Sequence, residues 1–350
     1  MSDQRLTKPQ GREDDARLLH AAARERLAVA AADLALPERL RLSDWQRTTV
    51  TALYAKLVRT VEDELRASLI QAGAVQSHEG LAAAFSSGQV SIAGPVLERS
   101  AAQPDTGLVS ALVRRTEEHR RARGRGAGEM PILIEFIKDR DPHVAEHAMA
   151  ILIAQSRRFD SFSEPAAART ELSAELAHRL VWRVAAALRH YMIAVHGFDP
   201  VAADWAIVAA AERLLAAYDE GDALEARAMR LAKRLHETER LTDTFIERAL
   251  SEGSLPLFLA GLGVRALLSH VSSWEIICDP RGRGPVFLLK AAGIERAQAV
   301  SILLALAASE EEVPSQVDLF DVTSPAAARD ALRLWQVNPG YREAIAELSA

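Results

Sequence analysis

The chain has 350 residues, a formal net charge of −6 and only 5% aromatic residues. Its one cysteine, Cys278, excludes an intramolecular disulfide and a multi-cysteine metal site. The first residues are polar and lack the apolar core of a secretory signal. No run approaches the roughly 20 uncharged apolar residues of a membrane helix. A soluble, cytoplasmic protein without membrane contact is therefore expected.

Alanine and leucine dominate the sequence and favour helix, because their side chains lose little freedom there. Residues 1–12 lack periodicity and predict a disordered tail. Residues 13–75 predict a helical hairpin, whose alanine-rich first helix ends before Pro37 and whose second helix begins at Ser43 or Asp44. Such a hairpin either caps the following domain or pairs with its copy in a homodimer.

Residues 76–163 predict a region of short-helix repeats. Helices are expected near 78–86, 89–100 and 105–121, and a further helix opens at Asp141-Pro142. Short helical units with apolar faces, joined by tight turns, are typical of stacked helix pairs of the HEAT type. The sequence shows no fixed period, so the expectation is an α-solenoid-like array without a demonstrated regular repeat.

Residues 164–350 predict a C-terminal helical domain organised around Glu171–His196. Apolar residues recur there every three or four positions, which indicates a helix buried on more than a third of its circumference. Asp199-Pro200 opens the next helix. The segment LPLFLAGLGVRALLSHV is expected to form one apolar unit that ends at Ser272, which has capping-box spacing with Glu275.

Towards the C-terminus, Arg296–Ala308 is expected to be helical, Glu310–Pro314 breaks the pattern, and Ser324-Pro325 starts a last amphipathic helix. The tryptophans on predicted apolar faces are expected to lie in the core: Trp182, Trp205, Trp274 and Trp335. The predicted fold class is all-α, with an N-terminal helical hairpin followed by stacked HEAT-like helix pairs.

The stretch ELAHRLVWRVAAALRHYM, with VSIAGPVLERS before it and FLLKAAGIERAQAVSILLAL after it, resembles the alphaproteobacterial family called domain of unknown function 2336. LVRTVEDELRASL resembles the first helical repeat of that family, so the resemblance covers most of residues 45–310. These motifs are apolar and the family has no established reaction. The resemblance therefore implies a helical fold and carries over no catalytic residue. The arginine- and glycine-rich stretch between Leu112 and Met130 departs from the family pattern.

VRRTEEHRRARGRGAG is a basic cluster in an acidic protein. Its candidate binding residues are Arg114, Arg115, Arg120, Arg121, Arg123 and Arg125. Arginines on a mobile segment can bind phosphates and give a salt-dependent affinity for nucleic acid. The aromatic residues that stack on bases are absent, however, and Glu117 and Glu118 partly neutralise the cluster. A solvated helix end is favoured, with nucleic acid or an acidic protein partner as alternatives.

The loop Arg281-Gly282-Arg283-Gly284 is a second candidate site, because glycine lets backbone N–H groups approach an anion. It lacks the spacings of nucleotide-binding motifs, and an ordinary connecting turn is favoured.

Histidines could hold a metal or a phosphoryl group. His143 and His147 are four residues apart on a predicted helix, but no third ligand is evident, so no metal and no cofactor is predicted. His178-Arg179 is similar to the start of a phosphoacceptor helix of sensor histidine kinases, although no ATP-binding domain follows. A partly buried, hydrogen-bonded histidine is favoured. Cys278 lies in an apolar run and is expected to be a buried, inert thiol.

The function that the sequence favours is a non-enzymatic helical scaffold or adaptor that binds a protein partner, since such arrays commonly present binding surfaces. A nucleic-acid-associated regulator that uses Arg114–Arg125 is the alternative, and a histidine phosphorelay component is a third. A homodimer through residues 13–75 is compatible with each of them.

Overall fold

The computed structural model describes residues 41–76, 78–88, 90–100, 105–123, 131–158, 166–279, 281–307 and 309–348. The predicted tail and the first helix of the predicted hairpin lie outside these residues. Contacts between residues divide the chain into residues 1–44 and residues 45–350. The described helices lie in the second unit, apart from Asp44, which begins the first of them.

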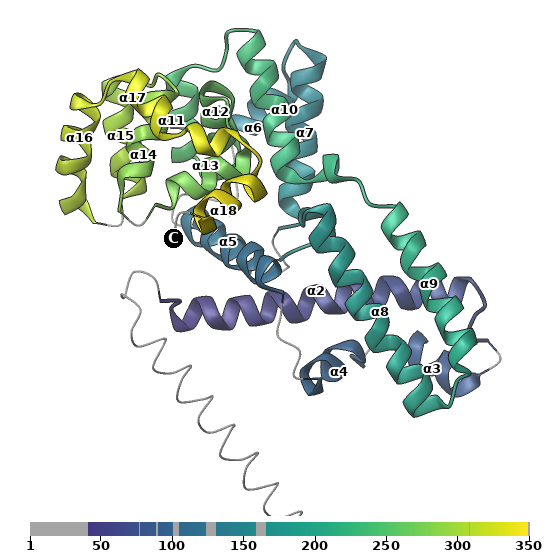
Figure 1. Cartoon of the computed structure of the whole chain (residues 1–350). Coiled ribbons are helices and arrows are strands. Elements are labelled where there is room, and N and C mark those ends of the chain that lie inside the picture. Colours follow the sequence, from purple (N-terminus) through teal and green to yellow (C-terminus); the bar gives the residue numbers. More distant parts are fainter. Residues whose placement is uncertain are drawn as a thin grey trace, which may run out of the picture. The chain divides into compact units, whose positions relative to one another are not determined.

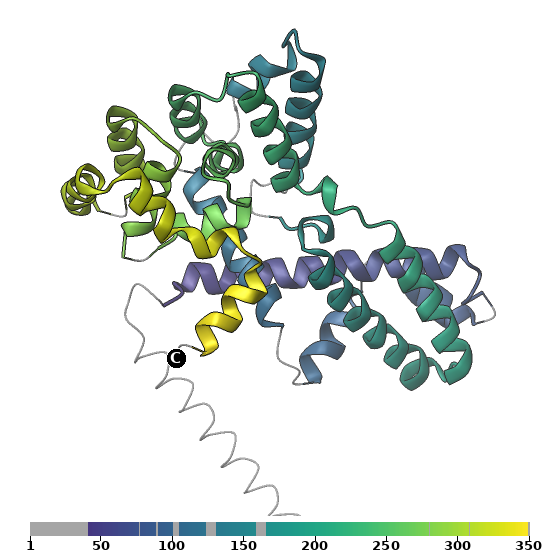
Figure 2. The ribbon, with the colours of Figure 1, turned by 45° about the horizontal axis from the view of Figure 1, so that its top comes forward.

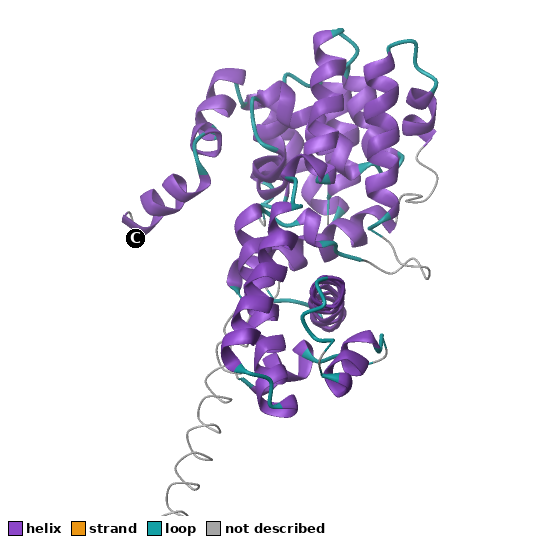
Figure 3. Cartoon of the chain, turned by 90° about the vertical axis from the view of Figure 1, so that its right-hand side faces the viewer, coloured by secondary structure: helices purple, strands orange, loops and turns teal. Residues whose placement is uncertain are grey.

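The described residues form seventeen α-helices and no strand (Figure 3), which confirms the all-α prediction. The first eight helices in Figure 1 are α2 (Asp44–Gln71), α3 (Glu79–Ser86), α4 (Ala93–Arg99), α5 (Thr106–Arg123), α6 (Pro131–Ile137), α7 (Pro142–Ser156), α8 (Ala174–His196) and α9 (Pro200–Ala216). The others are α10 (Leu224–Glu237), α11 (Asp243–Ser251), α12 (Leu255–Ala266), α13 (His270–Ile277), α14 (Arg283–Ala291), α15 (Arg296–Leu306), α16 (Val313–Val322), α17 (Pro325–Ala331) and α18 (Pro339–Leu348).

Several helices begin where the sequence places a capping residue. The Asp199 carboxylate accepts a hydrogen bond from the Ala202 N–H at 2.8 Å and is followed by proline, so α9 begins where it was predicted. The central helix, α8, is one turn shorter than predicted, because Arg169–Glu171 form a 3-10 turn and Ser173 is the N-cap. Gly197, at a φ of 60°, ends α8 in the left-handed conformation that glycine tolerates best.

Two apolar cores hold the helices together. The first is formed by α2 to α5 with α8 and α9, and the second by α6, α7 and α10 to α16. Figures 1 and 2 show α8 and α9 side by side, as their contacts also indicate. The two cores interleave along the chain, because α6 and α7 precede α8 and α9 in sequence. Neither core begins at residue 164, where a C-terminal domain was predicted to start.

The first core contains a buried ion pair between Glu62 and Arg66 of α2. The Glu62 carboxylate accepts hydrogen bonds from the Ile92 N–H (2.9 Å) and the Ala93 N–H (3.0 Å), which open α4. The Arg66 guanidinium donates to the carbonyls of Ser87 (3.2 Å) and Val90 (2.7 Å). Backbone polar groups of the loop between α3 and α4 therefore have partners on α2, which fixes that loop on the long helix.

α12 is the centre of the second core, since ten of its twelve residues are buried. The prediction that LPLFLAGLGVRALLSHV is one unit ending at Ser272 was wrong. Leu267 adopts a left-handed conformation, and the Leu268 N–H donates to the Gly263 carbonyl at 2.8 Å. The chain bends by 103° between α12 and α13. Ser269, not Ser272, caps α13 by accepting from the Ser272 N–H at 3.0 Å.

The prediction that Trp205 lies in the core was also wrong, because 76% of its surface is exposed. α9 buries Ala203, Ile207 and Ala210 and carries Trp205 on the opposite side. Trp274 is buried as predicted, while Trp182 and Trp335 are partly buried. α16 was not predicted, and α18 follows the helix that was predicted to be the last.

Among the described residues, no single helix combines the length and the apolarity needed to span a membrane. Only the bent pair α12–α13 reaches that apolarity, by length and composition alone.

Replacing Glu62 with alanine is expected to lower the free energy of unfolding by about 3–5 kcal/mol, because Arg66 then stays buried without its carboxylate. Urea unfolding of the full chain measures this change. Asp63→Ala, in the same turn but exposed, is the matched control and should change the free energy by less than about 0.5 kcal/mol. Equal losses in the two variants would contradict the role assigned to Glu62.

Candidate functional site

The centre of the candidate site is Arg158, which follows α7 and has only 3% of its surface exposed. Its guanidinium donates to three carboxylates from different parts of the fold. Nε bonds Glu171 at 2.6 Å, Nη1 bonds Glu118 at 2.9 Å and Nη2 bonds Glu225 at 2.5 Å. Because α5 and the turn before α8 belong to the first core and α10 to the second, Arg158 joins the two cores by ion pairs.

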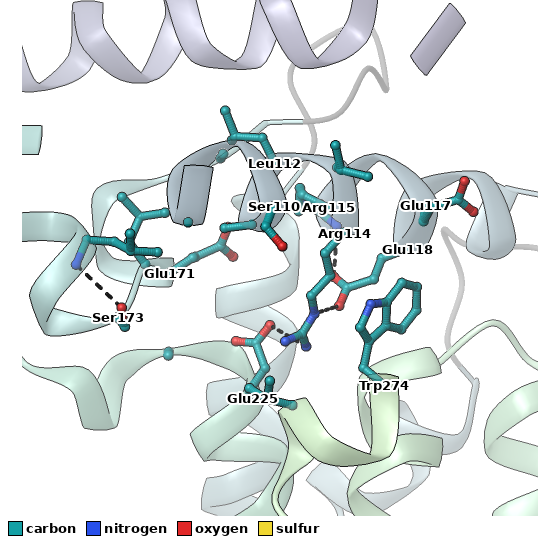
Figure 4. A pocket seen from close by; sticks show the side chains of 18 of the residues that line it. Ser110, Leu112, Arg114, Arg115, Glu117, Glu118, Glu171, Ser173, Glu225 and Trp274 are labelled. Carbon is teal, nitrogen blue, oxygen red and sulfur yellow. Dashed lines mark hydrogen bonds and ion pairs between the residues drawn. The ribbon is translucent and has the colours of Figure 1, made fainter. Parts of the chain in front are cut away.

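Two arginines of the predicted basic cluster belong to this network. Arg114 bonds Glu118 at 2.8 Å and His270 Nδ1 at 3.0 Å, and its guanidinium lies 5.6 Å from the centre of the Trp274 ring. Figure 4 shows Arg114 between Glu118, Glu225 and the Trp274 ring. Arg115 is buried and donates to the backbone carbonyls of Ala166 (3.1 Å) and Arg158 (2.8 Å).

The network sets the charge of its members. Burial alone would raise the pKa of Glu225, but Arg158, His270 and Arg114 lower it overall. Burial would likewise raise the pKa of Glu118, and Arg114 and Arg158 reverse that effect. Both carboxyl groups are therefore ionised at neutral pH. Burial, followed by the charge of Arg114, lowers the pKa of His270 to about 4, so this imidazole is neutral there.

The other arginines of the basic cluster lie further along α5. Arg120 is exposed and bonds Glu117 at 2.8 Å, and Arg121 is partly buried. The side chain of Arg123 and all of Arg125 lie outside the described residues. The structure therefore brings Arg114 and Arg115 into an ion-pair network, while binding of an external partner by the cluster stays a prediction.

The predicted anion loop binds a carboxylate of the chain itself. Asp279 accepts hydrogen bonds from the backbone N–H of Arg281 (3.0 Å), Arg283 (3.0 Å) and Gly284 (2.9 Å). A Cβ atom at position 284 would lie 2.0 Å from the Ile276 carbonyl oxygen, so only glycine fits there. Anion binding by the side chains of Arg281 and Arg283 stays a prediction, and the Arg283 guanidinium lies 5.5 Å from the Phe287 ring centre.

The histidines and the cysteine that were considered for chemistry lie apart. His178 is exposed rather than partly buried, and its Nε2 accepts from the Trp182 indole at 3.0 Å. His143 and His147 lie on α7, and the described residues contain no group of three potential metal ligands. Cys278 is partly buried, and burial raises the pKa of its thiol to about 11, so little thiolate forms at neutral pH.

A cavity of about 710 Å³ lies beside the network (Figure 4). Its wall consists of α5, residues 167–173, the first turns of α8 and α10, and α13. No local pattern in the sequence predicts this cavity, because its walls come from segments far apart in the chain. The only local signal was Glu118, four residues after Arg114, a spacing that pairs opposite charges on one helix face.

A second feature that was not predicted is an exposed apolar stripe on α9. Val201, Trp205 and Val208 are four and three residues apart, so they lie on one helix face, and all three are exposed. Large exposed apolar residues in a contiguous group mark interaction sites more often than isolated ones do. The helical period was visible in the sequence, but it could not show which of the two apolar faces is buried.

We expect Arg158→Met to lower the free energy of unfolding by about 3–5 kcal/mol, because the buried Glu118 and the partly buried Glu171 and Glu225 then lose their shared cation. Denaturant unfolding at neutral pH measures the loss. The matched control is Arg120→Met, whose exposed ion pair with Glu117 contributes about 0–1 kcal/mol. A loss as small as that of the control would mean that Arg158 does not hold the two cores together.

The neutral state of His270 predicts a pH dependence of stability. Between about pH 6.5 and pH 4 an unfolded chain protonates this histidine and the folded chain does not, so stability falls as pH falls, by up to about 3 kcal/mol. The free energy of unfolding, measured by denaturant unfolding at several pH values in this range, should depend less on pH in His270→Gln. His143→Gln, at an exposed position of α7, should keep the parent slope. Identical slopes in the parent and His270→Gln would refute the assignment.

One family of known proteins matches the chain. It is described as an uncharacterised protein conserved in bacteria, DUF2336, and the match spans residues 127–333, which contain α6 to α17. Residues 45–126, where the sequence resemblance was also noted, lie outside this match. No curated protein matches the chain, and no solved structure matches it. Because the matched segment is more than half of the 350 residues, the chain belongs to the DUF2336 family.

Proposed function

We propose that this protein is a non-enzymatic helical adaptor that binds a protein partner through the outer face of α9, the stripe formed by Val201, Trp205 and Val208. The observation that carries the proposal is the exposure of the Trp205 side chain in the middle of this stripe. Tryptophan is among the residues that contribute most to protein interfaces, because its large surface loses water on binding.

The order of helix contacts supports the adaptor. From the N-terminal to the C-terminal end of the second core, α6 packs against α7, α7 against α10, α10 against α12, α12 against α14 and α14 against α16. Such stacking fits the HEAT-like, α-solenoid-like array that the short helices predict. Proteins of that kind use extended faces for binding.

The charges around the stripe indicate what the partner presents. Arg189 is paired with Asp204, and the Arg213 guanidinium bonds the Ser68 hydroxyl at 3.1 Å. The exposed carboxylates that flank the stripe are Asp199 and Glu212. We therefore expect the partner to offer an apolar helix face bordered by lysine or arginine, which complements both the stripe and its flanks.

Nucleic-acid binding through Arg114–Arg125 has less support. Arg114 and Arg115 are engaged with Glu118, Arg158 and Ala166 inside the chain, and Arg120 is paired with Glu117. A phosphate would have to displace these partners.

The test places a photo-crosslinking amino acid at position 205 of the full chain in its native cells. We expect one dominant adduct with a second protein, which mass spectrometry identifies. The same crosslinker at position 341 is the control, since Tyr341 is 61% exposed on α18 but lies outside the stripe. No adduct at position 205, or the same adducts at both positions, would refute the proposal. An adduct with a second copy of the chain would mean that this face forms a homodimer and does not bind a different protein.

With the purified partner, Trp205→Ser should weaken binding by about 2 kcal/mol or more, which is roughly 30-fold, and leave stability within about 0.5 kcal/mol. The matched control is Val322→Ser, because Val322 is 81% exposed on α16. Calorimetry measures the affinity and urea unfolding the stability. Equal affinity of the parent and Trp205→Ser would exclude Trp205 from the interface.

A further inference from the structure

The cavity beside Arg158 has no role in the proposed adaptor surface. Its volume of about 710 Å³ lies within the range of roughly 300–1,000 Å³ that ligand pockets occupy. Apolar side chains supply most of its wall, among them Leu172, Leu176, Ala226, Val271 and Trp274. A largely apolar molecule would therefore lose water favourably on entering.

The polar part of the wall offers hydrogen-bond acceptors rather than donors. Each nitrogen of the Arg158 guanidinium already donates to a carboxylate, and Arg115 donates to two backbone carbonyls. Both arginines are buried more deeply than the carboxylates Glu117, Glu225 and Glu275, which also line the cavity. The third arginine of the wall, Arg114, is about as exposed as Glu225, at 18% against 20%, but its guanidinium is already bonded to Glu118 and His270. An anionic ligand would thus meet carboxylates, and each arginine that it could reach already has partners in the chain.

Glu225 is the acceptor best placed for a ligand. Its side chain is 20% exposed, and Oε1 holds both Arg158 (2.5 Å) and Arg114 (3.7 Å). The second oxygen, Oε2, accepts no hydrogen bond from the part of the chain that the structure describes. A carboxylate held rigidly at one oxygen and open at the other is pre-organised for a donor group, because the protein has already fixed its position.

We propose that this cavity binds a small, largely apolar molecule that carries a primary amine or an alcohol, with the donor group bonded to Glu225. The apolar part lies between α13 and the first turn of α8, and the amine or hydroxyl group points to the start of α10. This inference does not depend on the partner proposed for α9, because the two sites share no residue.

The chain contains its own reporter for the cavity. Cys278 is the only cysteine of the 350 residues, and it lines the cavity. A molecule in the cavity should therefore slow the alkylation of this thiol by N-ethylmaleimide. The raised pKa of the thiol makes the reaction slow enough to follow by mass spectrometry at about pH 8.5.

The experiment compares octylamine, 1-octanol and octanoate, which have the same chain length and differ in the head group. At about pH 8.5 the amine is protonated, as a lysine side chain would be. We expect octylamine and 1-octanol to slow alkylation of Cys278 in the full chain, and octanoate to need about tenfold higher concentration for the same effect. Equal protection by octanoate, or no protection by octylamine, would overturn the proposal.

Three variants locate the binding. Ala226→Trp fills the cavity from α10 and should abolish protection by octylamine, whereas Ala209→Trp adds the same side chain to a partly buried position of α9 outside the cavity and should leave it unchanged. Glu225→Gln should weaken octylamine about tenfold and 1-octanol much less. Protection that persists in Ala226→Trp would place the ligand elsewhere and refute the site.

Discussion

The rest of the structure depends on the ion pairs that Arg158 forms with three carboxylates. Arg158 follows α7, a helix of the second core. Two of its three carboxylate partners, Glu118 and Glu171, nevertheless belong to segments that pack on the first core. Its own backbone carbonyl accepts from Arg115, so the side chain and the main chain at this position are both held. The relation between the two cores is thus set by short, directional bonds as well as by apolar contact.

A buried network of this kind need not increase stability relative to apolar residues of the same volume, because each charge loses its water on folding. Its value lies in geometry. Arg114, Arg115 and Arg158 face Glu118, Glu171 and Glu225, so the formal charges balance. Any shift of one core against the other would leave at least one of these charges buried without a partner. The open cavity next to the network is consistent with this arrangement, since rigid walls are needed to keep such a space open.

Local signals made much of the fold predictable, whereas the candidate site is assembled from distant segments. Proline, glycine and capping residues set the ends of helices such as α8 and α9, because those signals act within one turn. The break at Leu267 could not be predicted, since packing around α12 imposes the left-handed conformation on a leucine. Trp205 was misplaced because only tertiary contacts decide which apolar face of α9 becomes the core. Glu225, which pairs with Arg114 of α5, and Glu171, which pairs with Arg158, lie far from the α5 arginines along the sequence and carry no local mark.

The family match and the cores together define the unit that must fold. The matched segment, residues 127–333, contains Arg158, Glu171 and Glu225 but not Glu118 or the α5 arginines. It also contains α8 and α9, whose buried faces pack on α2 to α5. If residues 127–333 were separated from the preceding helices, the apolar side of α8 would be exposed. The network would then keep one arginine, Arg158, and two carboxylates, Glu171 and Glu225. In this chain the matched segment therefore shares a core with the preceding helices, and the contacts place residues 45–126 in the same unit as that segment.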